Sequence, residues 1–415
     1  MREMKDSGVE WIGQIPKDWT VLPIKYVFNI NRGRVISVLN LVENGKYPVY
    51  SAQTENDGCF GYLNTYDFEG PAITWTTDGA KAGSVFYRDG RYNCTNVCGI
   101  LQLKGNYNDV NLYFATYAIA VVAQQNKRYD INGFKIMSNE MARIKFAIPN
   151  IVEQQQIADY LDTQCSEIDA TAEDIQKEIS LLEDYKKSVI TEAVTKGLNP
   201  DAEMKDSGVK WIGEIPVNWQ AVNPRWLFAQ RKDRAKKGME QYTASQKYGV
   251  ISQKDYMNRI GGSIVTVQKD FDILKMVCEG DFVIHMRSFQ GGLEYSEHTG
   301  SISSAYVMLI PQKNTGECRY FKWLFKSASY INALQSTSNL IRDGQAMRYS
   351  NFIQIIIPYP PLDEQQQIAD FLDTKCSEID AIIADKKRQR DILADYKKSL
   401  IYEYVTGKKE VPINE

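Results

Sequence analysis

The sequence contains few of the residues that metal sites and acid–base catalysis need. Its 415 residues include two histidines, His285 and His298, and seven cysteines, at positions 59, 94, 98, 165, 278, 318 and 376. No two cysteines form a Cys-x-x-Cys pair, so we expect neither a zinc site nor a disulfide framework. The GxxxxGK[ST] phosphate loop, the GxSxG elbow and the HExxH motif are also absent. These absences predict a chain that catalyses no reaction by itself and binds no cofactor or metal.

Long apolar runs are missing as well. No stretch approaches the roughly 18 uninterrupted apolar residues of a membrane span, and residues 1–6 lack the apolar core of a signal peptide. We therefore expect a cytoplasmic chain. Its length, with 43% hydrophobic and 24% charged residues, predicts two or three compact units.

Two segments of the chain occur twice. Residues 4–19 (MKDSGVEWIGQIPKDW) and 204–219 (MKDSGVKWIGEIPVNW) are identical at 12 of 16 positions, at an offset of 200. Residues 153–170 (EQQQIADYLDTQCSEIDA) recur as residues 364–381, at an offset of 211. The regions between them, 20–147 and 220–358, show little similarity. This order predicts a duplicated half, since a solenoid would need more copies of a shorter period.

The second repeated segment predicts a long amphipathic helix in each half, because its apolar residues recur every seven positions. The first seam is Leu161, Ile168, Ile175, Leu182 and Val189; the second is Leu372, Ile379, Leu393 and Leu400. Each helix alone would expose its stripe, so we expect the two to pack together as an antiparallel coiled coil. Docking of each helix on its own globular neighbour is the alternative.

The regions between the repeats combine strand and helix patterns. Strands are expected at 72–76, 84–87, 263–267, 281–285 and 305–310, and one helix in each region, at 111–124 and 320–334. The predicted fold class is therefore α/β (α+β), with two globular domains joined by two long helices in pseudo-two-fold duplicated halves. The predicted boundaries are 1–148, 149–200, 201–359 and 360–415.

Charge separates along the chain. The globular regions are basic, at net +3 for residues 20–147 and +7 for 220–358, whereas the helical segments 148–203 and 359–415 carry −9 and −3. This distribution suits a protein that holds a polyanion such as DNA at two places. Acidic coiled-coil faces are common, however, and would give the same pattern without DNA.

Several motifs resemble those of the specificity (S) subunits of bacterial type I restriction-modification enzymes. Residues 205–216 (KDSGVKWIGEIP) resemble the opening of a target-recognition unit, and residues 358–369 (PYPPLDEQQQIA) resemble its junction with a spacer helix. Residues 280–292 (GDFVIHMRSFQGG) are similar to a signature inside a recognition domain. The first junction, IPNIVE at 148–153, departs from the family pattern because it lacks the second proline.

The resemblance implies a non-catalytic subunit whose two target-recognition domains each read one half of a bipartite DNA target. Divergence of the two regions makes that target asymmetric. The implied partners are double-stranded DNA, two methyltransferase (M) subunits and, in the full complex, restriction/translocase (R) subunits. S-adenosylmethionine, ATP and Mg would belong to those partners. A helix over residues 151–194 would span about 66 Å, close to the roughly 68–72 Å of two B-DNA turns, so the helices would set the spacing of the half-sites.

Candidate DNA contacts are cations and polar side chains, some of them beside glycine-rich turns, because arginine and lysine pair with guanine and glutamine with adenine. In the first region they are Lys81, Arg88, Arg91, Arg128 and Lys135. In the second they are Arg287, Ser288, Gln290, Arg342, Gln345 and Arg348. The alternative for each cation is that it lies on the surface and contributes only to solubility.

Two sets of repeated residues are compatible with more than one role. Trp11, Trp19, Trp211 and Trp219 either anchor each half or face a partner, and the EQQQ runs at 153–156 and 364–367 either cap the helices or contact a partner. The competing function is a coiled-coil scaffold that joins two protein partners without binding DNA. A self-sufficient modification enzyme has no motif in its support.

Overall fold

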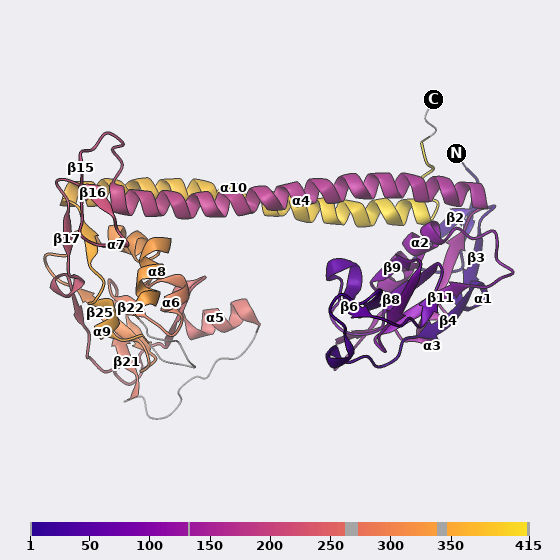
Figure 1. The fold of residues 1–415 in the computed structure, drawn as a ribbon, viewed down its shortest axis with the longest axis horizontal. Coiled ribbons are helices and arrows are strands. Elements are labelled where there is room, and N and C mark those ends of the chain that lie inside the picture. Colours follow the sequence, from indigo (N-terminus) through magenta and orange to yellow (C-terminus); the bar gives the residue numbers. More distant parts are fainter. Residues whose placement is uncertain (1, 132, 262–272, 338–346, 413–415) are drawn as a thin grey trace. The chain divides into compact units, whose positions relative to one another are not determined.

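The computed structural model describes residues 2–131, 133–261, 273–337 and 347–412. The chain divides into two compact units. Unit 1 is Met1–Gln176 together with Arg388–Glu415, and unit 2 is Lys177–Lys387. Each unit therefore contains one globular region and parts of both long helices (Figure 1). The finer division at residues 148, 200 and 359 stays a prediction.

The elements of unit 1 alternate short strands with few helices. Its strands are β1 (Met4–Asp6), β2 (Gln14–Pro16), β3 (Thr20–Pro23), β4 (Phe28–Arg32), β5 (Tyr47–Tyr50), β6 (Cys59–Leu63), β7 (Phe68–Glu69), β8 (Ala72–Thr76), β9 (Val85–Arg88), β10 (Arg91–Cys94), β11 (Cys98–Leu103), β12 (Arg128–Asp130), β13 (Gly133–Lys135) and β14 (Lys145–Ile148). Its helical elements are α1 (Ile24–Val27), η1 (Val38–Asn40), η2 (Glu55–Gly58), α2 (Leu112–Asn126) and α3 (Ser138–Met141).

Unit 2 follows the same order at its start and end. Its strands are β15 (Met204–Asp206), β16 (Glu214–Pro216), β17 (Gln220–Val222), β18 (Phe228–Gln230), β19 (Tyr242–Ser245), β20 (Gly249–Ser252), β21 (Lys275–Val277), β22 (Phe282–Ile284), β23 (Glu294–Tyr295), β24 (Gly300–Ile302), β25 (Val307–Pro311) and β26 (Ile357–Tyr359). Its helical elements are η3 (Pro224–Trp226), α5 (Gln253–Ile260), α6 (Ser288–Gly291), α7 (Cys318–Leu324), α8 (Ala328–Ser336) and α9 (Tyr349–Phe352).

The two copies of the first repeat form the same hairpin. β1 pairs with β2 and β15 with β16 in matching antiparallel registers, Met4 opposite Pro16 and Met204 opposite Pro216. The turn after β1 depends on Gly8, which has φ +67° and whose N–H donates to the Asp6 carboxylate at 3.0 Å. Identical residues therefore produce identical local structure in each half.

The diverged regions share one sheet despite their different sequences. Unit 1 contains a four-stranded antiparallel sheet in the order β4-β11-β8-β9, and unit 2 has one in the order β18-β25-β22-β23. The strands expected at 72–76, 84–87, 281–285 and 305–310 are confirmed as β8, β9, β22 and β25. The bounds of β8 are as expected, and those of the other three differ by one or two residues. The strand expected at 263–267 lies outside the described residues.

One predicted helix is wrong in its extent. The helix expected at 111–124 is confirmed as α2, but that expected at 320–334 is two helices, α7 and α8. Two hydrogen bonds account for the break. The Ser327 hydroxyl accepts from the Tyr330 N–H at 3.3 Å and caps α8, and the Phe325 carbonyl accepts from the N–H of Leu293, which is distant in sequence, at 3.4 Å. Apolar spacing alone does not reveal such a cap.

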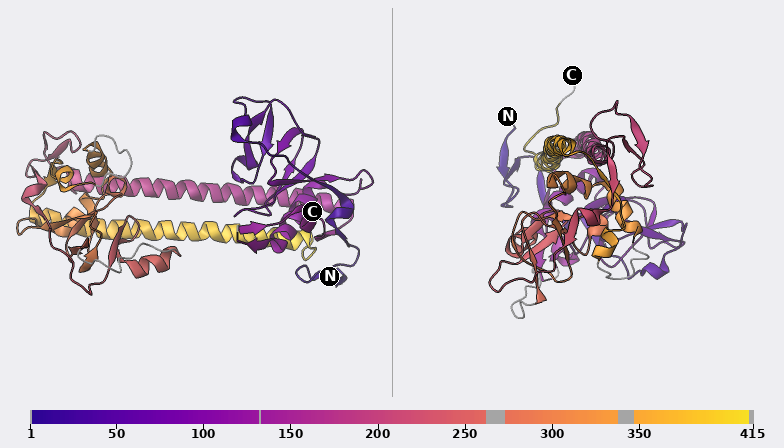
Figure 2. Two further views of the ribbon diagram at one scale, coloured as in Figure 1. Left: turned by 90° about the horizontal axis from the view of Figure 1, so that it is seen from below. Right: turned by 90° about the vertical axis from the view of Figure 1, so that its left-hand side faces the viewer.

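The long helices are α4 (Ile151–Lys196) and α10 (Leu362–Val405). All nine seam residues are buried or half-buried. In unit 1 residues 151–176 of α4 lie beside residues 388–405 of α10 and run in the opposite direction; in unit 2 the remaining parts pair in the same way (Figure 2). The predicted antiparallel coiled coil is confirmed. No helix in the described part of the chain is long and apolar enough to cross a membrane.

Each seam continues into the core of its globular region. In unit 1, Leu161 and Leu400 belong to the buried cluster that contains Trp19 and Trp75. In unit 2, Leu372 and Cys376 belong to the cluster that contains Trp219 and Phe228. Each long helix therefore packs against the other long helix and also against the globular region of its unit, because the same helix face contacts both.

Candidate nucleic-acid interface

A tryptophan from each tag is fixed to the start of a long helix. The Trp19 Nε1 donates to the Glu153 carboxylate at 3.1 Å, and the Trp219 Nε1 donates to that of Glu364 at 2.6 Å. Both indoles are fully buried, so the anchoring role is the correct interpretation for these two residues. Trp11 and Trp211 are half-buried.

The EQQQ runs join each helix to its globular region. The Gln154 side chain accepts from the backbone N–H of Asn111, the N-cap residue of α2, at 2.8 Å and donates to the Pro149 carbonyl at 2.9 Å. Gln365 accepts from the backbone N–H of Glu317, the N-cap residue of α7, at 2.9 Å and donates to the Pro360 carbonyl at 2.8 Å. Both glutamines are completely buried. They orient each globular region on its helix by the same hydrogen bonds.

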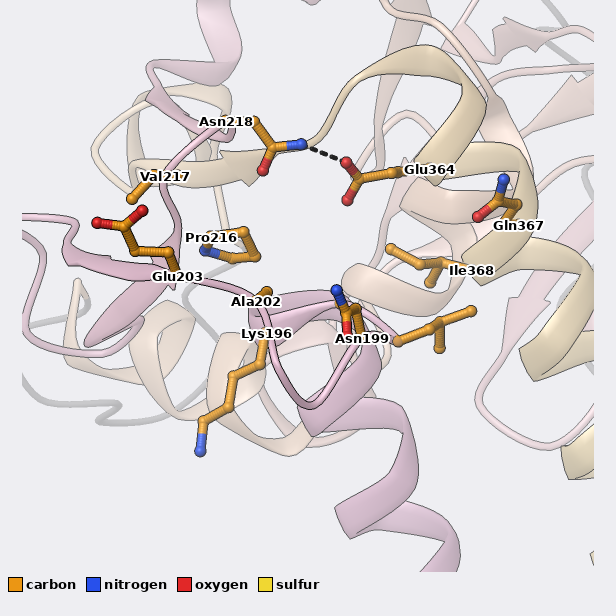
Figure 3. Close-up of a pocket in the computed structure, with 12 residues that line it drawn as sticks. Lys196, Asn199, Ala202, Glu203, Pro216, Val217, Asn218, Glu364, Gln367 and Ile368 are labelled. Atoms are coloured by element: carbon orange, nitrogen blue, oxygen red, sulfur yellow. Dashed lines mark hydrogen bonds between the residues drawn. The ribbon is translucent and has the colours of Figure 1, made fainter.

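A pocket of about 320 Å³ lies at this junction in unit 2. Its lining includes Lys196, Asn199, Pro216, Asn218 and Glu364 (Figure 3). The Asn218 amide donates to the Glu364 carboxylate, which also receives the Trp219 bond, so this carboxylate holds the tag. No group of three or more His, Cys, Asp or Glu side chains in the described ranges is arranged to hold a metal ion.

In unit 1 three of the predicted contacts lie on neighbouring loops. Lys81 is exposed in the turn between β8 and β9, and Arg128 lies opposite Lys135 in the β12–β13 hairpin. The Gly79 N–H donates to the Phe134 carbonyl at 3.0 Å, which joins that turn to the hairpin. Arg128 pairs with Glu140 at 2.6 Å. Burial alone would raise the pKa of Glu140, but hydrogen bonds from the Met137 N–H and Arg128 lower it.

The remaining two predicted contacts in unit 1 are engaged within the fold. The Arg88 side chain is 2% exposed, and its guanidinium donates to the Asp57 carboxylate at 2.5 Å and to the Thr74 hydroxyl at 3.2 Å. It also stacks on the Tyr50 ring at 3.7 Å. Arg91 is exposed but pairs with Glu69 at 2.8 Å. We therefore give Arg88 a structural role and leave it out of the interface.

In unit 2 the predicted contacts divide by exposure. Arg287 and Gln290 are exposed at α6, and Arg348 is exposed at the start of α9. Ser288 is completely buried, and its hydroxyl accepts from the His285 N–H at 2.8 Å, so it shapes the turn instead of facing outward. Arg342 and Gln345 lie outside the described residues.

Sequence reasoning missed two further groups of cations. Residues 231–237 (RKDRAKK) follow β18, and Lys232, Lys236 and Lys237 are exposed there; this run of charge was visible in the sequence. Lys247 and Arg259 both lie close to the Tyr248 ring, at 5.0 Å and 5.1 Å from its centroid. No sequence signal predicts this second group, because folding brings residue 259 back to residue 248.

The fold and these contacts define a class of protein, a chain built from two copies of one unit. The repeated segments form the same hydrogen bonds in both units, whereas the diverged regions present different exposed cations. Residues 16–181 and 216–389 match the family model described as the type I restriction modification DNA specificity domain. The chain belongs to this family, as the resemblance predicted.

Individual relatives agree with this assignment. The chain is 36% identical over 357 residues to the putative type I specificity subunit S.MpnORF507P of Mycoplasma pneumoniae, covering 84% of this chain and 87% of that protein. It is 43% identical over 141 residues to the putative type I specificity subunit S.MpnORF289P N-terminus of the same species, covering 34% and 74% respectively. A solved chain from a study of complex assembly and conformational transition of the type I R-M system has the same fold, with a TM-score of 0.67, 12% identity, and coverage of 95% and 99%.

Proposed function

We propose that the chain reads a bipartite DNA target, with the globular region of each unit contacting one half-site. The observation that carries this proposal is a set of exposed cations in unit 2 with no carboxylate partner among the described residues: Lys232, Lys236, Lys237, Lys247, Arg259, Arg287 and Arg348. Unpaired cations of this kind bind phosphates and supply salt-dependent affinity. Arg287 and Gln290 have the chemistry to read guanine and adenine edges.

The two half-sites differ in this proposal. The hydrogen bonds made by Glu153 and Gln154 are repeated by Glu364 and Gln365. The cations differ, because at the offset of 200 that relates the two tags Lys236 and Lys237 correspond to Ile36 and Ser37. Unit 1 instead offers Lys81 beside the β12–β13 hairpin. Because equivalent sheets carry different side chains, the two half-sites should differ in sequence. The coiled coil then sets the length of DNA between them.

Two exposed apolar side chains on α4 recur at the equivalent positions of α10, and this repetition supports the recruitment of two copies of one partner protein. Leu181 and Tyr185 on α4 are 69% and 51% exposed, and their equivalents Ile392 and Tyr396 on α10 are 59% and 52% exposed. Exposed apolar side chains kept in both repeats are typical of a protein contact. The partner implied by the family is a methyltransferase (M) subunit at each repeat, with restriction (R) subunits in the full complex. Catalysis, S-adenosylmethionine, ATP and Mg then belong to those subunits, acting on cytoplasmic DNA.

The test is methylome sequencing of cells that express the full chain with its methyltransferase partner. We expect one asymmetric bipartite motif that disappears without the chain. Arg287→Ala should relax one half-site and leave the other intact, whereas Lys313→Ala, an exposed cation outside the interface, should change neither. A motif that survives loss of the chain would contradict the proposal.

Two further measurements distinguish a DNA reader from a scaffold and from an enzyme. Retention of the chain on DNA should fall steeply with salt; a chain that binds its protein partner but never DNA would be a scaffold. The purified chain alone, given S-adenosylmethionine and DNA, should transfer no methyl group, and transfer would identify an enzyme.

A further inference from the structure

The turn between β19 and β20 lies directly on α6. The Gln246 amide donates to the Arg287 carbonyl at 3.1 Å, which joins the turn to the predicted reading residue. A Cβ added at Gly291 would lie 2.6 Å from Cγ and Nε2 of Gln246. The turn therefore packs so closely on α6 that only glycine fits at position 291 without displacing Gln246.

The C-terminal end of α6 is also held by residues at the end of α7. The Lys326 ammonium donates to the Gly291 carbonyl at 2.9 Å and to the buried Glu294 carboxylate at 2.5 Å. A Cβ at Gly292 would lie 1.9 Å from the Phe325 carbonyl oxygen, so α6 also touches the backbone between α7 and α8. Because these contacts hold α6 in place, Gln246 determines where the turn lies relative to Arg287.

The turn presents an aromatic ring close to two cations. Lys247 and Arg259 lie within 5.1 Å of the Tyr248 ring centroid, and Tyr256 packs edge-on to that ring with centroids 6.2 Å apart. Neither cation has a carboxylate partner in the described residues. An aromatic ring with unpaired cations is the combination that contacts bases and phosphates together. The positive charge favours DNA over an apolar or basic protein surface.

We propose that the β19–β20 turn is a second DNA-reading element of unit 2, with Tyr248 and Lys247 contacting DNA and Gln246 acting as the positioning residue that holds them beside Arg287. This inference rests on the proposed function. It assigns to the half-site of unit 2 a set of residues that the sequence motifs do not contain.

A double-mutant cycle tests the positioning role in the full chain bound to its methyltransferase partner. The probes are a duplex with the mapped motif and two duplexes in which one half-site is scrambled. Gly291→Ala should lower discrimination at the half-site of unit 2 roughly tenfold, because displacement of Gln246 moves the turn. Adding Gly291→Ala to Gln246→Ala should cause no further loss of discrimination, because the Gln246 side-chain atoms that the new Cβ would clash with are already absent. Additive losses, or equal losses at both half-sites, would overturn the positioning role.

Substitutions in the turn test the reading role without disturbing α6. Tyr248→Ala should weaken target binding roughly tenfold, whereas Tyr248→Phe, which keeps the ring, should bind nearly as wild type. Unchanged DNA binding by Tyr248→Ala, with or without weaker co-purification of the methyltransferase, would refute the element as a DNA reader. A wild-type complex that binds no DNA would instead refute the proposed function itself, which keeps the two failures distinct.

Discussion

Lys186 and Asp380 form an ion pair between the two long helices of unit 2, with the Nζ atom 2.7 Å and 2.6 Å from the two carboxylate oxygens. Their equivalents, Lys397 and Asp169, form the same pair in unit 1 at 2.6 Å and 2.7 Å. Each residue and its equivalent are 211 positions apart, the offset of the helical repeat. Antiparallel pairing of two copies of one helix produces this reciprocity, since each copy supplies the acid at one contact and the base at the other.

Reversing one charge should weaken the coiled coil, and reversing both should restore it. Lys186→Glu opposes Asp380 with a like charge and should lower the free energy of unfolding by about 0.5–1 kcal/mol, because the pair is partly exposed. Combining it with Asp380→Lys should recover most of that loss in urea unfolding. Lys187→Glu, whose pairing partner Asp184 lies on the same helix, is the control for helix propensity. A swap that stays as unstable as the single variant would argue against the pair.

Gln365, the completely buried glutamine of the second EQQQ run, should contribute more to stability than its half-buried neighbour Gln366. Gln365→Ala leaves the Glu317 N–H and the Pro360 carbonyl without a partner in a buried site, so we expect a loss of about 1–3 kcal/mol. Gln366→Ala removes a solvent-exposed hydrogen bond to Asp370 on the same helix, at 3.3 Å, and should stay within about 0.5 kcal/mol of wild type. Thermal or urea unfolding distinguishes the two, and equal losses would mean that the hydrogen bonds contribute little.

Shortening both long helices should change the gap in the DNA target. Deleting residues 174–180 and 385–391 removes one heptad at equivalent places and about 10 Å of helix, which corresponds to roughly three base pairs at 3.4 Å each. Methylome mapping should show both half-sites unchanged with a shorter gap. Altered half-sites with the original gap would contradict the spacing role of the coiled coil.

The repeated exposed pair should control how many partner subunits bind. Leu181→Asp should remove one methyltransferase copy, Ile392→Asp the other, and the double variant both, because a carboxylate disfavours burial in an apolar contact. Native mass spectrometry of the co-purified complex counts the copies. Leu198→Asp, a substitution at a half-exposed apolar residue beyond the end of α4, is the matched control. Two copies retained by the double variant would show that the partner binds elsewhere.

The coiled coil should lose stability in alkaline solution. Burial raises the pKa of the Cys376 thiol to about 11, above the roughly 8.5 of an unfolded cysteine. The folded state therefore keeps its proton where the unfolded state releases it, so this contribution is complete below about pH 8.5 and decreases as pH rises toward 11. The wild-type chain should lose more stability over that window than Cys376→Ala. Parallel pH profiles would show that the thiol does not titrate with unfolding.

Some of this architecture follows directly from residue patterns. The seven-residue spacing of Leu161 through Val189 predicts the seam, because a helix places those positions on one face whatever surrounds it. The identical tags predict identical hairpins for the same local reason. The split of α7 from α8 escapes prediction, since it depends on the Ser327 cap and on a carbonyl used by Leu293, which is distant in sequence.

The candidate interface depends more on the tertiary structure. Arg88 and Ser288 have the right chemistry for DNA contact, yet burial against Asp57 and His285 turns both into structural residues. Conversely, Tyr248 has Lys247 as its neighbour in the sequence but gains Arg259 only when α5 folds back toward the β19–β20 turn.

By itself, the sequence determined the duplication, the helical seam and the family, since each is a property of order and spacing along the chain. Only the tertiary structure decided which charged side chains remain exposed and unpaired, because burial and ion pairing depend on residues that are brought together from distant parts of the sequence.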